Sequence, residues 1–467
     1  MTASSAPSTH AIVSDIWRYG LPTAAPLDAL SLTGVEPGLP SSFRLGAAGQ
    51  AAIAAAALAA AEIWRVRSGR RQSVSVDLAH AMAEMRSERH FSVAGAETPD
   101  LWDPLNTVYA TGDGGWLRMH TNFAHHRAGV VKILGCADTR EAVAEAMLGW
   151  RGEDFETEAS SRGLVVAKAR TFAEWDAHPH AKALATLPMM EVRKIGEAPP
   201  TPLPATGNRP LSGVRILDLT RIIAGPVGGR TLAAHGAEVL LITAPHLPAV
   251  PGLVTDTGRG KRSARLDLRQ VADKARLRDL VRGADVFLQG YRPGGLDDLG
   301  FSAEAMAAVK PGLIRADICA YGFDGPWAPK RGFDSLVQCA TGFNLAEGEA
   351  AGTGGPKAFP CQALDHISGY LLAFGIMAAL LRRADEGGSW QVRVSLAQTA
   401  LWLRGLGRLP DGPSASDPGE AEVEPFLEET QSGFGALRAV RHSAVLSETP
   451  ARWEQPCVPH GTHQPMW

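Results

Sequence analysis

The sequence predicts an α/β protein in which helices cover both faces of a parallel β-sheet. Short apolar runs of strand length recur in the second half of the chain, and they are VRILDL (214–219), AEVLLIT (237–243), DVFLQ (285–289) and LIRADI (313–318). Helix-like stretches such as VADKARLRDLVRGA and SAEAMAAVK separate them. Strands that are apolar throughout are typical of a parallel sheet buried on both faces, and alternation with helices indicates crossover connections.

The composition is that of an ordinary globular chain. Its 467 residues are 45% hydrophobic and 20% charged, with a formal net charge of −3. This length suffices for two or three domains. Because the net charge is small, no strong field favours nucleic acid or an anionic membrane, and we expect neither as a partner.

The cysteines and the N-terminus favour a cytoplasmic protein. The opening MTASSAPSTHAIVSD has neither a basic n-region nor an apolar h-region, so no signal peptide is predicted. No metal site is predicted either, because the paired histidines in AHHRAG and HPHAKA lack ordered carboxylate or cysteine partners. Five dispersed cysteines without a CxxC pair are typical of reduced thiols: Cys136, Cys319, Cys339, Cys361 and Cys457.

A proline-rich stretch, IGEAPPTPLPATGNRPLS, divides the chain. The Ala-rich run AAGQAAIAAAALAAAEIW before it is predicted as a buried helix and not a membrane span. GFNLAEGEAAGTGGPKAF (342–359) is predicted as a Gly-rich loop, and the Pro-, Ser- and acid-rich 411–432 as a mobile loop. The predicted units are a partial first copy of long helix and strand (1–83), a small domain (84–200), a linker (201–210), the sheet domain (211–410) and a mobile loop with a closing segment (411–467).

The sequence contains an internal echo. Residues 51–81 resemble residues 370–400, and both read as a long helix, a glycine turn, an alternating strand and a helix. This common pattern favours duplication over coincidence. One gapless offset of 318 residues pairs Ala60, Arg65, Gly69, Val74 and Leu78 with Ala378, Arg383, Gly387, Val392 and Leu396. The same offset pairs Asp365 with Ala47, so the first copy lacks this acid.

Asp365 stands at the start of a long apolar helix within CQALDHISGYLLAFGIMAALLRR (361–383). Local rules favour a helix cap, because Asp is a preferred N-cap residue that contributes about 1 kcal/mol. A carboxylate at the mouth of a helix is also exposed for chemistry. The local sequence leaves both interpretations open.

Several segments carry a family resemblance because they follow one another in a fixed order. LSGVRILDLTRIIAGPVGGRTLAAHGAEVLLITAP is followed by GKRSARLDL, ADVFLQGYRPGGLDDLG, YGFDGPWAPKRGFDSLVQCATG and LDHISGYLLAFGIMAALLRR. These segments resemble the family III CoA-transferases, the group of formyl-CoA and carnitine CoA-transferases and α-methylacyl-CoA racemases. Earlier segments, GRRQSVSVDL, YATGDGGWLRMHTN and TFAEWDAHPHAKAL, resemble later parts of that family, as does the C-terminal HSAVLSETPARWEQPCVPHGTH.

The resemblance implies a Rossmann-like parallel-sheet domain with helices on both faces, plus a smaller α+β domain, linked by long helices. The chain looks like two incomplete copies joined, the first without the sheet and the second without the small domain. Family members are interlocked rings of two chains, so we expect either a monomer with one composite site or a homodimer. Asp365 is the only nucleophile candidate of the two copies.

The resemblance makes Asp365 the catalytic residue. A carboxylate can attack an acyl-CoA thioester to give a mixed anhydride, the released thiolate gives an aspartyl-CoA thioester, and an incoming acid reverses the sequence. An acyl-CoA and a carboxylic acid acceptor are therefore the expected partners. Coenzyme A takes part as a substrate thioester, and no permanently bound cofactor is expected.

Residues that match the family's CoA-binding segments are predicted to contact coenzyme A, with arginines suited to its phosphates. Two departures stand among these segments. The family's acidic residue after the second strand is Thr243 here, and its Glu-Asn-Phe is Gln289-Gly290-Tyr291. The predicted contacts are Arg221, Ile222, Ile223, Ala224, Lys261, Arg262, Gln289, Tyr291, Arg292 and Arg331.

Three alternatives stay open at this point. An α-methylacyl-CoA racemase needs two bases, but Phe333 stands here at the position of the racemase histidine. Racemisation would then require His366 or a small-domain residue to replace that base. A non-catalytic CoA-binding protein would explain the altered contacts but has no need of Asp365. An intramolecular CoA shift, which is an isomerase reaction, would use the same aspartate.

Overall fold

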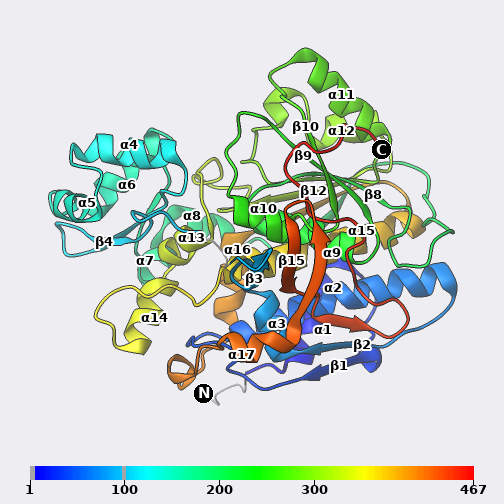
Figure 1. Cartoon of the computed structure of the whole chain (residues 1–467), viewed down its shortest axis with the longest axis horizontal. Coiled ribbons are helices and arrows are strands. Elements are labelled where there is room, and N and C mark those ends of the chain that lie inside the picture. The colour runs from blue at the N-terminus through cyan, green and yellow to red at the C-terminus, as the bar shows by residue number, and fades with distance from the viewer. Residues whose placement is uncertain (1–5, 97–100) are drawn as a thin grey trace.

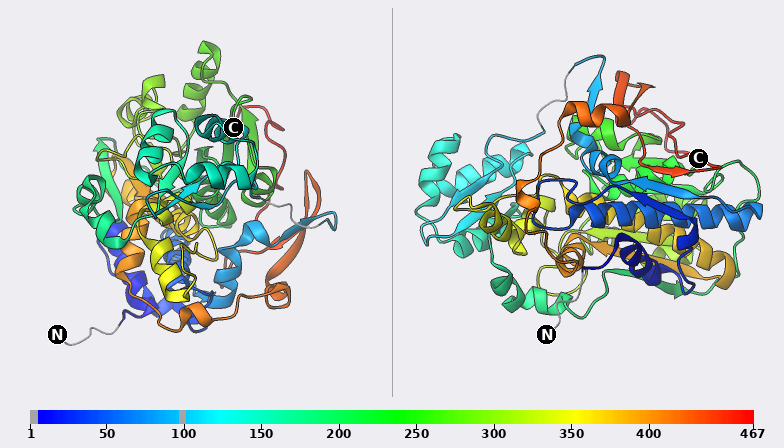
Figure 2. Two further views of the ribbon diagram at one scale, coloured as in Figure 1. Left: turned by 90° about the vertical axis from the view of Figure 1, so that its left-hand side faces the viewer. Right: turned by 90° about the horizontal axis from the view of Figure 1, so that it is seen from below.

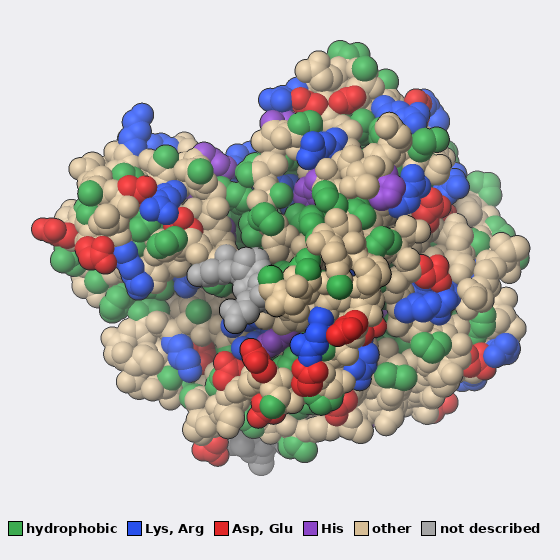
Figure 3. All heavy atoms as spheres, viewed as in Figure 1, with side chains coloured by type: hydrophobic (Ala, Val, Ile, Leu, Met, Phe, Trp, Pro, Cys, Tyr) green, Lys and Arg blue, Asp and Glu red, His purple; other side chains and the backbone are tan. Residues whose placement is uncertain are grey.

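The computed structural model describes residues 6–96 and 101–467 (Figure 1). Residues 1–5, where the predicted first copy and the N-terminal stretch begin, and 97–100, within the predicted small domain, lie outside the described residues. A main body contains a large sheet, and a smaller domain projects from one side of it, at the left of Figure 1. On the face in Figure 3, acidic and basic side chains are interspersed.

The described residues form a sheet of seven strands in the order β10-β9-β8-β11-β12-β13-β7. All neighbours are parallel except β7, which runs antiparallel to β13 at one edge. This confirms the predicted α/β class and the four apolar runs predicted as strands. The strands are β7 (Met190–Gly196), β8 (Arg215–Leu219), β9 (Glu238–Thr243), β10 (Lys261–Arg265), β11 (Val286–Gln289), β12 (Ile314–Cys319) and β13 (Ser389–Ser395).

Helices cover both faces of the sheet, because alternate strand residues enter two separate cores. Ile216 and Val239 pack toward α9 (Ala224–Ala234) and α15 (Ala363–Glu386) in one core. Leu217 and Leu240 join the other core with α11 (Val271–Arg282) and α12 (Ala303–Val309).

Two long helices, α2 (Leu45–Ser68) and α15, lie side by side at the centre of the body (Figure 2). Each is apolar and long enough to cross a membrane, but 94% of each apolar window is buried inside the protein. The prediction of a buried Ala-rich helix is confirmed. Both helices end at a glycine with positive φ, Gly69 at 74° and Gly387 at 64°, a conformation that favours a residue without Cβ.

The secondary-structure elements around these helices occur twice in the same order, as the similarity between residues 51–81 and 370–400 predicts. α2 and α15 begin and end at positions 318 residues apart. Next come β2 (Val74–Asp77) and α3 (Leu78–Glu84) in the first half, and β13 and α16 (Leu396–Gly405) in the second. β2 lies between parallel β1 (Leu30–Thr33) and antiparallel β16 (Ala444–Leu446), as β13 lies between parallel β12 and antiparallel β7.

The smaller domain has its own core, which includes Tyr109, Leu117, Val143 and Phe155. Its antiparallel sheet has the order β4-β5-β6, and two helices lead back to the body. The elements are β4 (Val108–Ala110), β5 (Trp116–Met119), β6 (Val166–Lys168), α4 (Ala124–Leu134), α5 (Arg140–Met147), α6 (Gly152–Ser161), α7 (Phe172–Ala177) and α8 (Pro179–Leu184). β7, which belongs to the large sheet, comes from the range predicted as the small domain.

Two predicted loops contain regular structure. Residues 342–359 include α14 (Phe343–Ala351), because Gly342 and Gly352 bound the helix at φ of 104° and 64° instead of interrupting it. Residues 411–432 include α17 (Glu420–Val423) and β14 (Leu427–Ser432). β14 pairs with β15 (Gly435–Val440), and β15 pairs with the distant β3 (Phe91–Val93), a partner that local composition does not reveal.

The other helices are α1 (Thr9–Gly20), which packs on α2, α10 (Pro251–Thr257) and α13 (Asp334–Ala340). Short 3-10 turns cover Leu27–Ala29, Ser87–Arg89, Asp297–Leu299, Gly412–Ser414 and Glu424–Phe426.

Candidate active site

Asp365 lies in the first turn of α15 and does not cap it. The helix begins at Ala363, and Gln362 occupies the N-cap position. The Asp365 side chain is 6% exposed, and its carboxylate accepts no hydrogen bond from another described residue. A negative charge in the first turn is favoured by the helix dipole. Because Gln362 is the N-cap, the capping interpretation is wrong, and the buried carboxylate has no hydrogen-bond partner among the described residues.

Asp334, the first residue of α13, accepts a backbone hydrogen bond from the first turn of α15 instead. Its Oδ2 accepts the backbone N–H of Asp365 at 2.9 Å, and the Gln338 amide donates to its Oδ1. The first half repeats this contact, since Glu36 Oε1 accepts the backbone N–H of Ala47 at 2.9 Å. A carboxylate from elsewhere in the chain thus caps each long helix.

The pKa of the Asp365 carboxyl lies well above its usual value. Burial is the main cause, and the charges of Asp334 and Glu88 add to it. Burial also raises the pKa of Asp334, to about 6. The two carboxyls titrate jointly because each charge opposes the other. An ionised Asp365 is destabilised in this place, and bonding to an acyl group removes its charge.

Glu88, from the first half of the chain, reaches the residue next to Asp365. Its Oε2 lies 3.0 Å from His366 Nε2, and both side chains are fully buried. Burial opposes ionisation of Glu88, but His366 outweighs it and lowers the pKa of Glu88. The adjacent Asp365 and His366 point in different directions, as successive helix residues must: Asp365 lines the cavity and His366 meets Glu88.

A cavity of about 330 Å³ lies beside Asp365 at the carboxyl ends of β8, β11 and β12. Ligands of open α/β sheets bind at this edge. The small domain contributes Phe123, His125, His126 and Val165 to its wall. Of the predicted CoA contacts, those that line it are Arg221, Ile222, Ile223, Ala224, Tyr291, Arg292 and Arg331.

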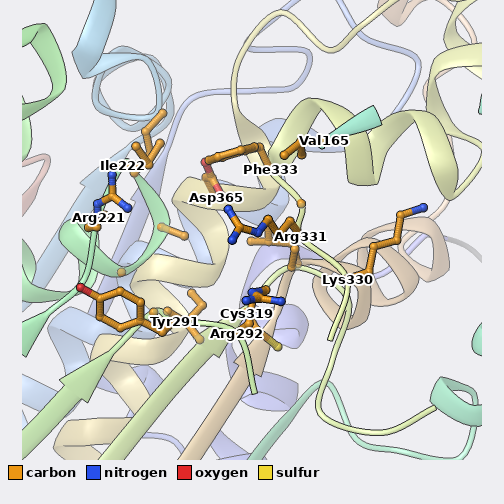
Figure 4. A pocket seen from close by; sticks show the side chains of 18 of the residues that line it. Val165, Arg221, Ile222, Tyr291, Arg292, Cys319, Lys330, Arg331, Phe333 and Asp365 are labelled. Carbon is orange, nitrogen blue, oxygen red and sulfur yellow. The ribbon is translucent and has the colours of Figure 1, made fainter. Parts of the chain in front are cut away.

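Three arginines from different loops surround this cavity (Figure 4). Arg221 donates to the carbonyl of Pro248, and Arg292 donates to the carbonyl of Pro329 at 3.3 Å. Burial, followed by the charge of Arg292, lowers the pKa of Arg331. None of the three forms an ion pair with a carboxylate among the described residues, so their charges are free to meet an anion.

The turn between β8 and α9 contains a strained residue. Ile222 has a φ of 74°, a region that β-branched residues rarely adopt. α9 then begins without a side-chain cap, which leaves backbone N–H groups at its N-terminus. Such outliers concentrate at functional sites, where they set the path of the backbone.

Three predicted contacts do not line this cavity. Lys261 Nζ donates to Asp218 Oδ2 at 2.9 Å and to the Pro226 carbonyl at 2.8 Å, and the residue is only 2% exposed. It borders a smaller cavity that also includes Arg221 and Ile222. Arg262 pairs with Glu238 at 3.3 Å. Gln289 donates to Asp317 at 2.7 Å and accepts the backbone N–H of Tyr291.

Sequence reasoning missed several residues of the site, because the fold brings them from distant segments. Glu88 and His120 had no local motif. His126 is buried, neither ring nitrogen bonds to a described residue, and burial lowers its pKa to about 4. Lys330, which also lines the cavity, pairs with Glu156 at 2.7 Å.

The chain is similar in sequence to a known protein family and to several of its members. The model of "CoA-transferase family III" matches residues 211–410. A "Probable fatty acyl-CoA transferase Rv3272" of Mycobacterium tuberculosis is 33% identical over 55% of this chain and 70% of its own length. A "Formyl-CoA:oxalate CoA-transferase" of Streptomyces coelicolor is 31% identical over 45% of this chain and 54% of its own. A "Succinate--glutarate CoA-transferase" of Agrobacterium fabrum is 32% identical over 40% and 51%.

Among solved structures, the orthorhombic crystal form of Rv3272 from M. tuberculosis matches with a TM-score of 0.39 and 32% identity, over 43% of this chain and 59% of that one. The chain spans about half the length of most of the curated relatives described above. The family model covers the predicted sheet domain, and the chain covers 70% of the mycobacterial relative at 33% identity. The chain therefore belongs to CoA-transferase family III.

Proposed function

We propose that the chain transfers coenzyme A between an acyl-CoA and a carboxylic acid through Asp365. The observation that carries this proposal is the buried Asp365 carboxylate, without a hydrogen-bond partner in the part of the chain that the structure describes, beside a cavity surrounded by arginines. An anion-binding wall suits the CoA phosphates, and a carboxylate without partners suits covalent attack. The relatives named as CoA-transferases support the same reaction class.

In the proposed mechanism, an Asp365 oxygen bonds to the thioester carbonyl carbon and the C–S bond breaks. CoA leaves as a thiolate, and an acyl-aspartyl anhydride remains. The thiolate then bonds to the Asp365 carbonyl carbon, which releases the first acid and leaves an aspartyl-CoA thioester. The acceptor carboxylate attacks this thioester and the same two steps run in reverse, so no net proton or electron is required.

The surrounding residues have separate roles in this proposal. The arginines would hold CoA phosphates, and the N–H groups at the start of α9 would face charge that develops near Asp365. Asp334 fixes the first turn of α15, which positions the nucleophile. The small domain closes one wall of the cavity and excludes water, which would hydrolyse the anhydride.

Intact-protein mass spectrometry with a panel of acyl-CoAs tests this function. A CoA adduct is expected on the native chain and absent from Asp365→Ala. Asp385→Ala, an exposed residue near the other end of α15, is the matched control and should retain the adduct. An adduct that persists in Asp365→Ala would refute the assignment of the nucleophile.

We also infer that the chain is a double-copy member with one composite site. The supporting observations are the repeated bounds of α2 and α15, the repeated strand arrangement, and Glu36 beside Ala47 where Asp334 lies beside Asp365. Light scattering after size exclusion should then give about 49.4 kDa, the mass of one chain. A species of twice this mass that never dissociates would count against one site per chain.

Racemase-type proton transfer has one specific observation in its favour. His120 of the small domain stacks on Phe333, with ring centroids 3.9 Å apart, and so stands close to where the racemase histidine is missing. However, burial lowers the pKa of His120 to about 3, which makes it a weak base. Exchange of the α-proton of a branched acyl-CoA into deuterated water, without any CoA adduct, would favour this alternative.

A further inference from the structure

Asp365 lines two cavities that differ in charge. The first is the arginine-rich cavity of about 330 Å³. The second holds about 20 Å³, and the two share Phe123, Ile222, Ile223, Phe333 and Asp365 as lining residues. The nucleophile is therefore available from both spaces at once.

We propose that this small cavity holds the acyl group during transfer, and that it selects short, uncharged acyl groups over those with a second carboxylate. The inference rests on the proposed CoA transfer at Asp365 and adds the substrate class. In an acyl-aspartyl anhydride, the acyl group and the departing CoA must occupy different spaces. The arginines mark one space for the phosphates, which leaves the other for the acyl group.

The size of the cavity limits the length of the acyl group. One water-sized group needs roughly 10–15 Å³ of such space, so a cavity of about 20 Å³ admits only one or two atoms beyond the carbonyl. Its apolar wall includes Leu101, Val250 and Leu253. These dimensions fit acetyl and propionyl groups and not longer chains.

The charge of the cavity rejects a second carboxylate. Glu88 and Asp334 line it, and no lysine or arginine does so among the described residues. Its histidine, His120, is neutral because burial lowers its pKa to about 3.

The basic side chains nearest Glu88 are His366 and Arg89, and neither lines the cavity. Arg89 Nε is 3.8 Å from Glu88 Oε1, and this oxygen accepts no hydrogen bond from the described residues. A dicarboxylic acyl group would bury its free carboxylate beside two acids without compensation.

The panel of acyl-CoAs tests the limit on acyl length separately from the rejection of a second carboxylate. Adduct formation on the full chain is timed by intact mass with acetyl-, propionyl-, octanoyl- and succinyl-CoA. We expect propionyl-CoA to react at least about 10-fold faster than octanoyl-CoA and about 100-fold faster than succinyl-CoA. Succinyl-CoA within about threefold of propionyl-CoA would overturn the charge argument, and octanoyl-CoA at the same rate would overturn the size argument.

Failure of the underlying function gives a different result. If coenzyme A binds but no acyl-CoA forms an adduct, the proposed transfer and the inference are both wrong. Reactivity with succinyl-CoA would refute the inference alone.

Variants of the apolar wall test the location of the acyl group. Leu253→Ala enlarges the cavity, so the octanoyl-to-propionyl rate ratio should rise about 10-fold. Leu277→Ala, the same change in the core on the other face of the sheet, should leave the ratio unchanged. If Leu253→Ala does not fold, Val250→Ala changes a half-buried side chain of the same wall at smaller cost. A folded wall variant with an unchanged ratio would place the acyl group elsewhere.

Discussion

Replacing Asp365, the proposed nucleophile, should make the protein more stable. The pKa of Asp365 in the folded chain lies well above its usual value because of burial and the nearby acids. The unfolded chain, with a pKa of about 3.9, loses this proton more readily, so folding is penalised as the pH rises above that value. The penalty is complete above the folded pKa and fades as the pH falls through the unfolded pKa, well below which both states are protonated. Asp365→Asn removes the charge and with it the penalty.

The size of the gain follows from the same linkage. Each pKa unit corresponds to about 1.4 kcal/mol, and little is lost to solvent screening because the side chain is only 6% exposed. Asparagine gives up a favourable dipole interaction of about 0.3–1 kcal/mol. We therefore expect a net gain of about 1 kcal/mol or more in the free energy of unfolding. For a chain of 467 residues the unfolding entropy is about 1 kcal/mol/K, so the melting temperature should rise by about 1 °C or more.

Calorimetry at pH 8 and pH 4 provides the measurement. Asp365→Asn should melt higher than the native chain at pH 8, with a much smaller difference at pH 4, while CoA-adduct formation is lost. Glu304→Gln, which removes an exposed first-turn acid from α12, is the control and should not raise the melting temperature. No gain at pH 8, or the same gain at pH 4, would refute the burial argument.

Two further predictions concern the surroundings of Asp365. Asp334→Asn removes a charge that raises the pKa of Asp365, so the acid limb of the pH–rate profile should move to lower pH. Glu36→Gln, at the matching contact of the first half, should leave the profile in place. Arg331→Ala should raise the KM for acyl-CoA about 10-fold, with kcat within about twofold, because a charge-assisted phosphate contact is lost. Arg382→Ala, which removes a surface arginine paired with Glu386, should change neither constant. A loss in kcat larger than the effect on KM would assign Arg331 to the chemical step.

β8, β9, β11 and β12 could be predicted because they are apolar on both sides, so each of them is visible in a short window of sequence. β7, β10 and β14 were not predicted, since their side chains alternate or are polar. α14 was missed because its glycines were taken as loop residues, although the fold uses two of them as helix boundaries.

The candidate site was only partly predictable for a related reason. The family motifs led to residues beside Asp365, such as Arg221 and Arg331, that do line the cavity. They did not show that the ammonium group of Lys261 would donate hydrogen bonds to Asp218 and to the Pro226 carbonyl. The cap of α15 comes from Asp334, and local rules cannot see a cap supplied through tertiary contact. Glu88 depends on the packing of the first half against the second.

The twin helices α2 and α15 have unequal freedom to change. In a symmetric pair of identical subunits, every substitution alters the nucleophile-bearing helix and its neighbour together. Here α2 carries Ala47 and α15 carries Asp365, so a change in α2 alters the support of the site without altering the proposed nucleophile. Under the proposed mechanism, one gene can thus change the supporting helix while the covalent step at Asp365 stays intact.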